Sequence, residues 1–117
     1  MRRSKELLAA IGTGVLLIAA TPAHAQQDFC HDPRTDAERR ICDDLDLAML
    51  ERAFERRHDR LLRRIGGTKK GRSMARRLRS ALLDRRNDCG TDEWCIREAY
   101  EVARLTYLRI MGPPGLY

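Results

Sequence analysis

Residues 43–67, which read DDLDLAMLERAFERRHDRLLRRIGG, contain the pattern that decides the fold. Apolar side chains and one histidine recur there at spacings of three or four residues: Leu47, Leu50, Phe54, His58, Leu61 and Ile65. This spacing places them on one stripe of an α-helix. Asp43-Asp44 precedes the pattern and Gly66-Gly67 ends it, as helix boundaries commonly do. The sequence therefore predicts one long amphipathic helix whose stripe must be covered by other helices.

A shorter helix is predicted before this segment. Thr35 and Glu38 have the spacing of a capping box, in which each side chain satisfies a backbone N–H at the start of a helix. Asp36 adds negative charge to the same first turn, where the helix dipole favours it. We therefore expect a helix from Asp36 to about Cys42, with Ile41 facing inward.

The segment after the long helix combines a basic loop with a third helix. Residues 68–72 (TKKGR) follow two glycines, and this composition predicts a mobile basic loop. A helix is then predicted from Ser73 to Cys89, where Gly90 ends it. Its expected inner side consists of Met74, Leu78, Ala81, Leu82 and Arg85.

The last predicted helix begins at Thr91 and ends before Gly112. Its apolar stripe, again at spacings of three and four residues, consists of Ile96, Tyr100, Ala103, Tyr107 and Ile110. Tyr100 and Tyr107 are expected in the core. The fold class predicted from these four segments is all-α, a small helical bundle in which the last two helices form an antiparallel hairpin.

The N-terminal segment has the three-part layout of a secretory signal. Three basic residues come first, an almost wholly apolar run follows over residues 7–20, and Ala23-His24-Ala25 supplies small residues for cleavage. A transmembrane anchor is the alternative, but the run is shorter than the roughly 20 apolar residues that span a bilayer. We expect residues 1–25 to be removed and residues 26–117 to form one periplasmic or secreted domain without a membrane span.

The four cysteines, Cys30, Cys42, Cys89 and Cys95, all follow the predicted signal. An oxidising compartment favours disulfides in so small a domain, and four cysteines permit three pairings. Proximity along the chain favours Cys30 with Cys42, and Cys89 with Cys95 across the corner between two helices. A zinc site that includes His31 is the alternative, but the spacing matches no common zinc pattern. We expect no metal and no other cofactor.

These residues resemble a known family. ERRIC at 38–42, LAMLE at 47–51, Arg86 shortly before Cys89, and Cys95-Ile96 followed by Tyr100 are similar to the four-cysteine domain of the LprI-like lysozyme inhibitor family of exported bacterial proteins. The resemblance spans nearly all of residues 26–117. It implies an envelope protein that binds and blocks lysozyme, with motif positions of structural importance at Glu38, Ile41, Leu47, Leu50, Arg86 and Tyr100.

The chain departs from the family pattern at several positions. Arg79 and Leu82 stand where members often carry Gln and Trp, Asn87 stands where Asp is usual, and His58 stands where Tyr is common. These departures leave the expected fold unchanged.

Catalytic chemistry finds little support in residues 26–117. Two histidines, His31 and His58, and two serines, Ser73 and Ser80, are present, and no glycine-rich phosphate loop or spaced set of metal ligands accompanies them. An active site needs a nucleophile, base or metal in a preorganised pocket. The sequence therefore predicts a protein that is not an enzyme. For His58, a hydrogen-bonded core position is favoured over a role as a pH sensor.

Candidate partner-binding residues form a basic cluster. It consists of Arg63, Arg64, Lys69, Lys70 and Arg72, with Arg76, Arg77 and Arg79 following. One reading is a solvated face. In a second, the cluster enters the acidic cleft of a glycoside hydrolase such as lysozyme. In a third, it binds anionic envelope polymers, or nucleic acid without sequence specificity.

Two further observations bear on a partner. Trp94 is expected to pack over the Cys89–Cys95 corner, and the alternative is an anchor for a partner protein. Residues 26–117 contain 20 basic and 16 acidic residues, so a basic animal lysozyme would be repelled at long range. Local complementarity would then have to supply the attraction. The sequence does not predict an oligomeric state.

Overall fold

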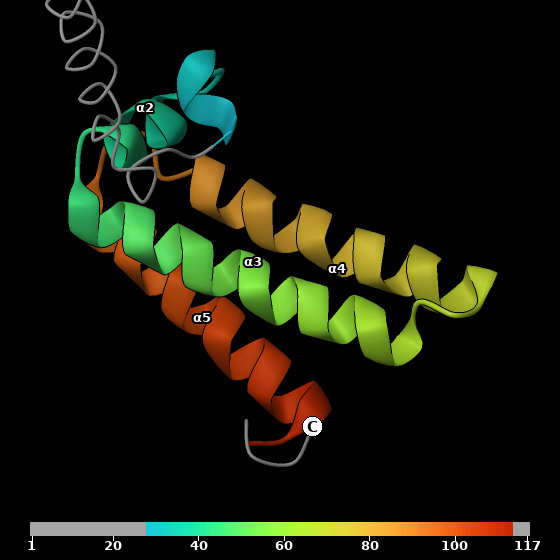
Figure 1. Cartoon of the computed structure of the whole chain (residues 1–117). Coiled ribbons are helices and arrows are strands. Elements are labelled where there is room, and N and C mark those ends of the chain that lie inside the picture. Colours follow the sequence, from blue (N-terminus) through green and yellow to red (C-terminus); the bar gives the residue numbers. More distant parts are fainter. Residues whose placement is uncertain (1–27, 114–117) are drawn as a thin grey trace, which may run out of the picture.

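The computed structural model describes residues 28–113, which form five helices (Figure 1). They are the 3-10 helix η3 (Asp28–His31) and the α-helices α2 (Asp36–Cys42), α3 (Leu45–Ile65), α4 (Lys69–Asn87) and α5 (Glu93–Met111). The predicted all-α fold is confirmed. The predicted signal peptide at residues 1–25 lies outside the described residues.

Three long helices lie side by side, and the short helices cover one end of them (Figure 1). α4 runs antiparallel to α3 and α5, whereas α3 and α5 are parallel. Arg97 pairs with Asp46 at 3.8 Å near the starts of α5 and α3, and the Arg64 guanidinium donates to the Met111 carbonyl at 3.4 Å near their ends. We call the end that carries α2 the capped end. The opposite end, where α3 turns into α4 and α5 finishes, is the tip.

Helix starts at the capped end are fixed by side chains. Thr35 Oγ1 accepts from the Glu38 N–H at 3.0 Å, and the Glu38 carboxylate accepts from the Arg34 N–H at 2.7 Å. The Thr35 half of the predicted capping box is therefore present, whereas Glu38 accepts from the residue before the N-cap rather than from Thr35 itself. Asp44 caps α3 by accepting from two N–H groups of its first turn, and Asp92 caps α5. α5 thus begins two residues later than the predicted start at Thr91.

The predicted mobile loop at residues 68–72 is wrong. α4 begins at Lys69, and Thr68 caps it by accepting from the Gly71 N–H at 3.0 Å. Gly71 is buried in the first turn, and a Cβ there would lie 1.7 Å from the Ile65 carbonyl oxygen. The glycine therefore permits close approach of α4 to the end of α3, whereas the sequence pattern made it look like a helix breaker.

Replacing Gly71 with alanine should lower the free energy of unfolding by about 1–3 kcal/mol, because the new methyl group would force α4 away from α3. Gly67 is the matched control, since a Cβ there meets nothing within 4 Å. Urea unfolding of the two alanine variants is the measurement. Equal stability of the two would show that the close approach is unimportant.

The inner faces of α4 and α5 differ in part from the predicted stripes. α4 buries Gly71, Ala75, Leu82 and Arg86, while Leu78 is partly buried. The expected inward residues Met74, Ala81 and Arg85 are exposed. The face is displaced because small residues and a buried arginine occupy it. In α5, Ile110 is 55% exposed, and Met111 fills the end of the stripe instead.

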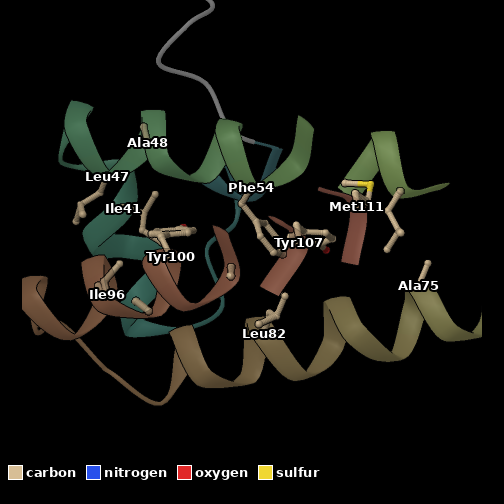
Figure 2. Close-up of a cluster of buried hydrophobic side chains, with 13 residues drawn as sticks. Ile41, Leu47, Ala48, Phe54, Ala75, Leu82, Ile96, Tyr100, Tyr107 and Met111 are labelled. Atoms are coloured by element: carbon tan, nitrogen blue, oxygen red, sulfur yellow. The ribbon is translucent and has the colours of Figure 1, made fainter. Parts of the chain in front are cut away.

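The core runs the length of the bundle (Figure 2). Ile41, Leu47 and Ile96 gather near the capped end, and the rings of Phe54 and Tyr107 meet edge to face at 5.9 Å in the middle. His58 is buried beside them, with Nδ1 3.2 Å from the Tyr107 hydroxyl oxygen. The predicted hydrogen-bonded core histidine is confirmed. Burial, together with the charge of Arg79, lowers the pKa of His58.

Two disulfides join the predicted pairs. Cys30–Cys42 ties η3 to the end of α2, and Cys89–Cys95 spans the corner between α4 and α5. Gly90, in that corner, has a φ of +62°, which glycine adopts without strain. The helical hairpin of α4 and α5 is thus closed covalently. Because all four cysteines are taken up in these two disulfides, none is free to bind zinc, and the zinc alternative is wrong.

Candidate functional site

The predicted basic cluster lies together at the tip. Arg63 and Arg64 end α3, and Lys69, Lys70 and Arg72 begin α4 on the other side of a three-residue turn. All five side chains are exposed. The sequence brings them together simply because the turn at residues 66–68 is short.

The fold concentrates far more positive charge near the tip than these five residues alone supply. The half of the bundle nearest the tip, residues 55–79 and 101–113, contains thirteen Lys and Arg residues and three Asp and Glu residues. The capped half, residues 28–54 and 80–100, contains seven basic and thirteen acidic residues. The molecule is therefore strongly polarised, which a net charge averaged over the chain conceals.

A hollow opens beside the turn at the tip. Its volume is about 390 Å³, and it is lined by Arg64, Ile65, Gly67, Thr68, Lys70, Gly71 and Met74. Ile65 and Met74 contribute apolar side chains to this lining, and Arg64 and Lys70 contribute cations. The first turn of α4 carries no acidic residue, so the positive end of its dipole adds to the field there. The hollow can therefore accept a group that is apolar or aromatic and has negative charge nearby.

Trp94 lies at the opposite end of the molecule. It occupies the first turn of α5 and is 76% exposed, contrary to the expected packing over the Cys89–Cys95 disulfide. About 25 Å of helix separates it from Met111, at the helical rise of 1.5 Å per residue. The structure thus divides the predicted partner-binding residues into two sites at opposite ends.

The residues that carry the family resemblance meet at the capped end. Arg86, which is 3% exposed, donates to Glu51 at 2.9 Å and to Glu38 at 3.2 Å. The Tyr100 hydroxyl donates to the same Glu51 carboxylate. The other motif positions pack around them: Ile41 and Leu47 are fully buried and Leu50 is partly buried.

Glu51 is not among the predicted structural positions, although the sequence holds a signal for its burial. Charged side chains are usually solvated, yet Glu51 is 2% exposed. Its position four residues after Leu47 and three before Phe54 fits the apolar stripe of α3. Arg86 likewise follows Leu82 by four residues. Opposite charges at stripe positions of two helices are the pattern that would have predicted a buried ion pair.

Electrostatics at this cluster favour a structural role. Burial raises the pKa of the Glu51 carboxyl, and the charge of Arg86 and the Tyr100 hydrogen bond oppose that effect without cancelling it. Burial and the Glu51 charge raise the pKa of the Tyr100 hydroxyl. Asn87 completes the set, because its side-chain oxygen accepts from Arg86 at 2.8 Å. These groups satisfy one another away from solvent and fix how α2, α3, α4 and α5 meet.

Comparisons with protein-family models, curated proteins and solved structures found no match to this chain. Within residues 28–113, no helix combines the length and the apolar character needed to cross a membrane. In the same part of the chain, no group of three or more His, Cys, Asp or Glu side chains is arranged to hold a metal ion. The two disulfides indicate an oxidising, extracytoplasmic setting.

Proposed function

We propose that this protein is a periplasmic or secreted, non-catalytic inhibitor of a lysozyme-type glycoside hydrolase, which it contacts through its basic tip. The observation that carries the proposal is the excess of thirteen basic over three acidic residues in the tip half. Such hydrolases act with paired carboxylates in a cleft. The resemblance to LprI-like proteins supplies the target class.

The shape and charge of the tip suit this role. Arg63 and Arg64 at the end of α3 and Lys70 at the start of α4 are exposed on either side of a tight turn, and a narrow end of this kind can enter a concave surface that a flat face could not. Arginine also pairs with a carboxylate through two parallel hydrogen bonds. Because the capped half is acidic, the long-range repulsion between the whole molecule and a basic lysozyme is weaker than the charge of the tip alone would produce.

Anionic envelope polymers are a second candidate ligand of the same tip. The charge excess that favours a carboxylate cleft also favours phosphate or carboxylate groups repeated along a polymer. Binding of that kind would release counterions and weaken steeply with added salt. A protein target held by a defined set of contacts would instead saturate at one molecule per site.

The test is a cell-wall lysis assay with lysozyme and increasing amounts of the oxidised protein. We expect saturable inhibition. The double change Arg63→Glu and Lys70→Glu should weaken it about tenfold or more, a loss of about 1.4 kcal/mol in binding free energy, because it reverses two charges that favour an acidic cleft. Arg34→Glu with Arg85→Glu is the matched control, because it reverses two exposed arginines of the capped half. Undiminished lysis in the presence of excess protein would overturn the proposal. Steep salt dependence of binding to an anionic polymer would then favour the second candidate.

A further inference from the structure

The capped end presents large apolar side chains that are exposed to solvent and are not part of the core. Leu45 and Met49 are each 53% exposed and lie one turn apart on α3, while Trp94 on α5 is 76% exposed. The Asp46–Arg97 ion pair joins the two helices here, at 3.8 Å. Met49 follows Asp46 by three residues and Trp94 precedes Arg97 by three, so both neighbour this seam. We call Leu45, Met49 and Trp94 the apolar patch.

The surroundings of the apolar patch are acidic. Asp43 and Asp46 flank it on the α3 side, and Asp92, Glu93 and Glu98 flank it on the α5 side. An exposed tryptophan on α5, at the same end of the bundle as exposed leucine and methionine on α3, is typical of a protein contact rather than of a solvated surface. The acidic border favours a partner surface that is positively charged.

The tip of the same molecule has the complementary properties. Its hollow of about 390 Å³ has apolar lining from Ile65 and Met74 and cations from Arg64 and Lys70. An indole ring fits a hollow of this size, and its face attracts a cation placed over it. The two surfaces also carry opposite charge, because the tip half is basic and the capped half is acidic.

We propose that copies of this protein associate head to tail, with Trp94 of one copy seated in the hollow at the tip of the next. A second copy is the favoured occupant because each molecule carries both halves of the contact at opposite ends. Two different patches meet, so the contact does not close a symmetric dimer, and it produces open chains that lengthen with concentration. Charge complementarity makes the association sensitive to salt. This association does not require lysozyme, and the two contacts would compete because both use the tip.

Two variants separate the halves of the contact. Trp94→Ala removes the anchor and keeps the hollow, and Lys70→Glu with Met74→Glu disrupts the hollow and keeps Trp94. All three positions are exposed, so both variants should fold, as circular dichroism can verify. In sedimentation velocity at low salt, the average mass of the unaltered protein should rise with concentration beyond that of a dimer. Salt at about 0.5 M should reverse this rise, because it shortens the Debye length to a few ångströms. Each variant alone should remain monomeric.

Mixing the two variants gives the decisive measurement. The hollow of the Trp94→Ala variant should accept Trp94 of the other variant, so a one-to-one complex should form where each component alone is a monomer. The chain contains one tryptophan, and the Trp94→Ala partner has none. Tryptophan emission of the mixture therefore reports Trp94 of the hollow variant, and it should shift to shorter wavelength as the indole leaves water.

Three results would overturn the proposal. They are a monomeric unaltered protein at all concentrations, association of the hollow variant with itself, and unchanged emission on mixing. The second would indicate a contact between two capped ends, in which the tip plays no part.

Discussion

Replacing Arg86 with methionine is expected to lower the free energy of unfolding by about 3–5 kcal/mol, the usual effect of breaking a buried ion pair by removing one partner. Arg86 is 3% exposed and Glu51 is 2% exposed, with 2.9 Å between their paired atoms. Without the guanidinium, the Glu51 carboxylate would stay buried with the Tyr100 hydroxyl as its remaining hydrogen-bond donor. Urea or thermal unfolding measures the loss, and Arg85→Met, at an exposed neighbour, should change stability by less than about 0.5 kcal/mol.

The pH dependence of this loss follows from the pKa of Glu51. Burial already raises that pKa in the folded protein, and removing Arg86 takes away the charge that lowers it. A carboxyl whose pKa is raised by folding favours the folded state at low pH, and this contribution is lost as the pH rises through the folded pKa. The difference in stability between Arg86→Met and the unaltered protein should therefore shrink on acidification. Adding Glu51→Gln should restore part of the stability at neutral pH. A deficit no larger than that of Arg85→Met would show that the ion pair contributes little.

Loss of both disulfides should lower the free energy of unfolding by about as much as Arg86→Met does. Chain-entropy estimates give about 3 kcal/mol for the Cys30–Cys42 loop and about 2 kcal/mol for the smaller Cys89–Cys95 loop. Small domains have a total stability of about 5–15 kcal/mol, so reduction should leave much of the protein unfolded on mild heating. Thermal unfolding with and without a reductant measures this. Unchanged melting after full reduction, verified by thiol titration, would contradict it.

The two bridges should not be equivalent. Cys30–Cys42 also holds η3 in place, where Phe29 packs on the core and lies 5.3 Å from the Arg86 guanidinium. Changing Cys30 and Cys42 to alanine removes this cover from the buried cluster, whereas changing Cys89 and Cys95 frees a corner that Gly90 already shapes. The first pair of changes should therefore cost more stability than the second. The reverse order would mean that η3 contributes little.

Periodicity predicted α3 and α5 well because their inner faces are almost continuously apolar. α4 was less predictable, since Gly71 and Ala75 supply its close packing and carry little hydrophobic signal. The register of its inner face was placed incorrectly because the predicted stripe followed Met74 and Ala81, and so included Arg85 in place of the buried Arg86. Pattern rules treat charge as a mark of the surface, so they overlook a buried ion pair such as Glu51–Arg86.

The candidate site was predictable only where its parts are adjacent in sequence. Arg63, Arg64 and Lys69 were grouped correctly because one short turn joins them. The charge asymmetry and the separation of Trp94 from the tip depend on the parallel placement of α3 and α5, which no local pattern encodes. The assignment of the tip to a ligand therefore rests on the assembled molecule.

The buried cluster lies at one end of the bundle, and this has a consequence for local unfolding. Two disulfides and the Glu51–Arg86 pair lock the capped end, while Gly71 and Ala75 leave the tip with few buried atoms on α4. Opening of the structure should therefore begin at the tip and proceed as a gradient, with the capped end retained longest. The end that we propose to contact lysozyme is also the end that can change shape at the lowest cost, so recognition there need not be rigid.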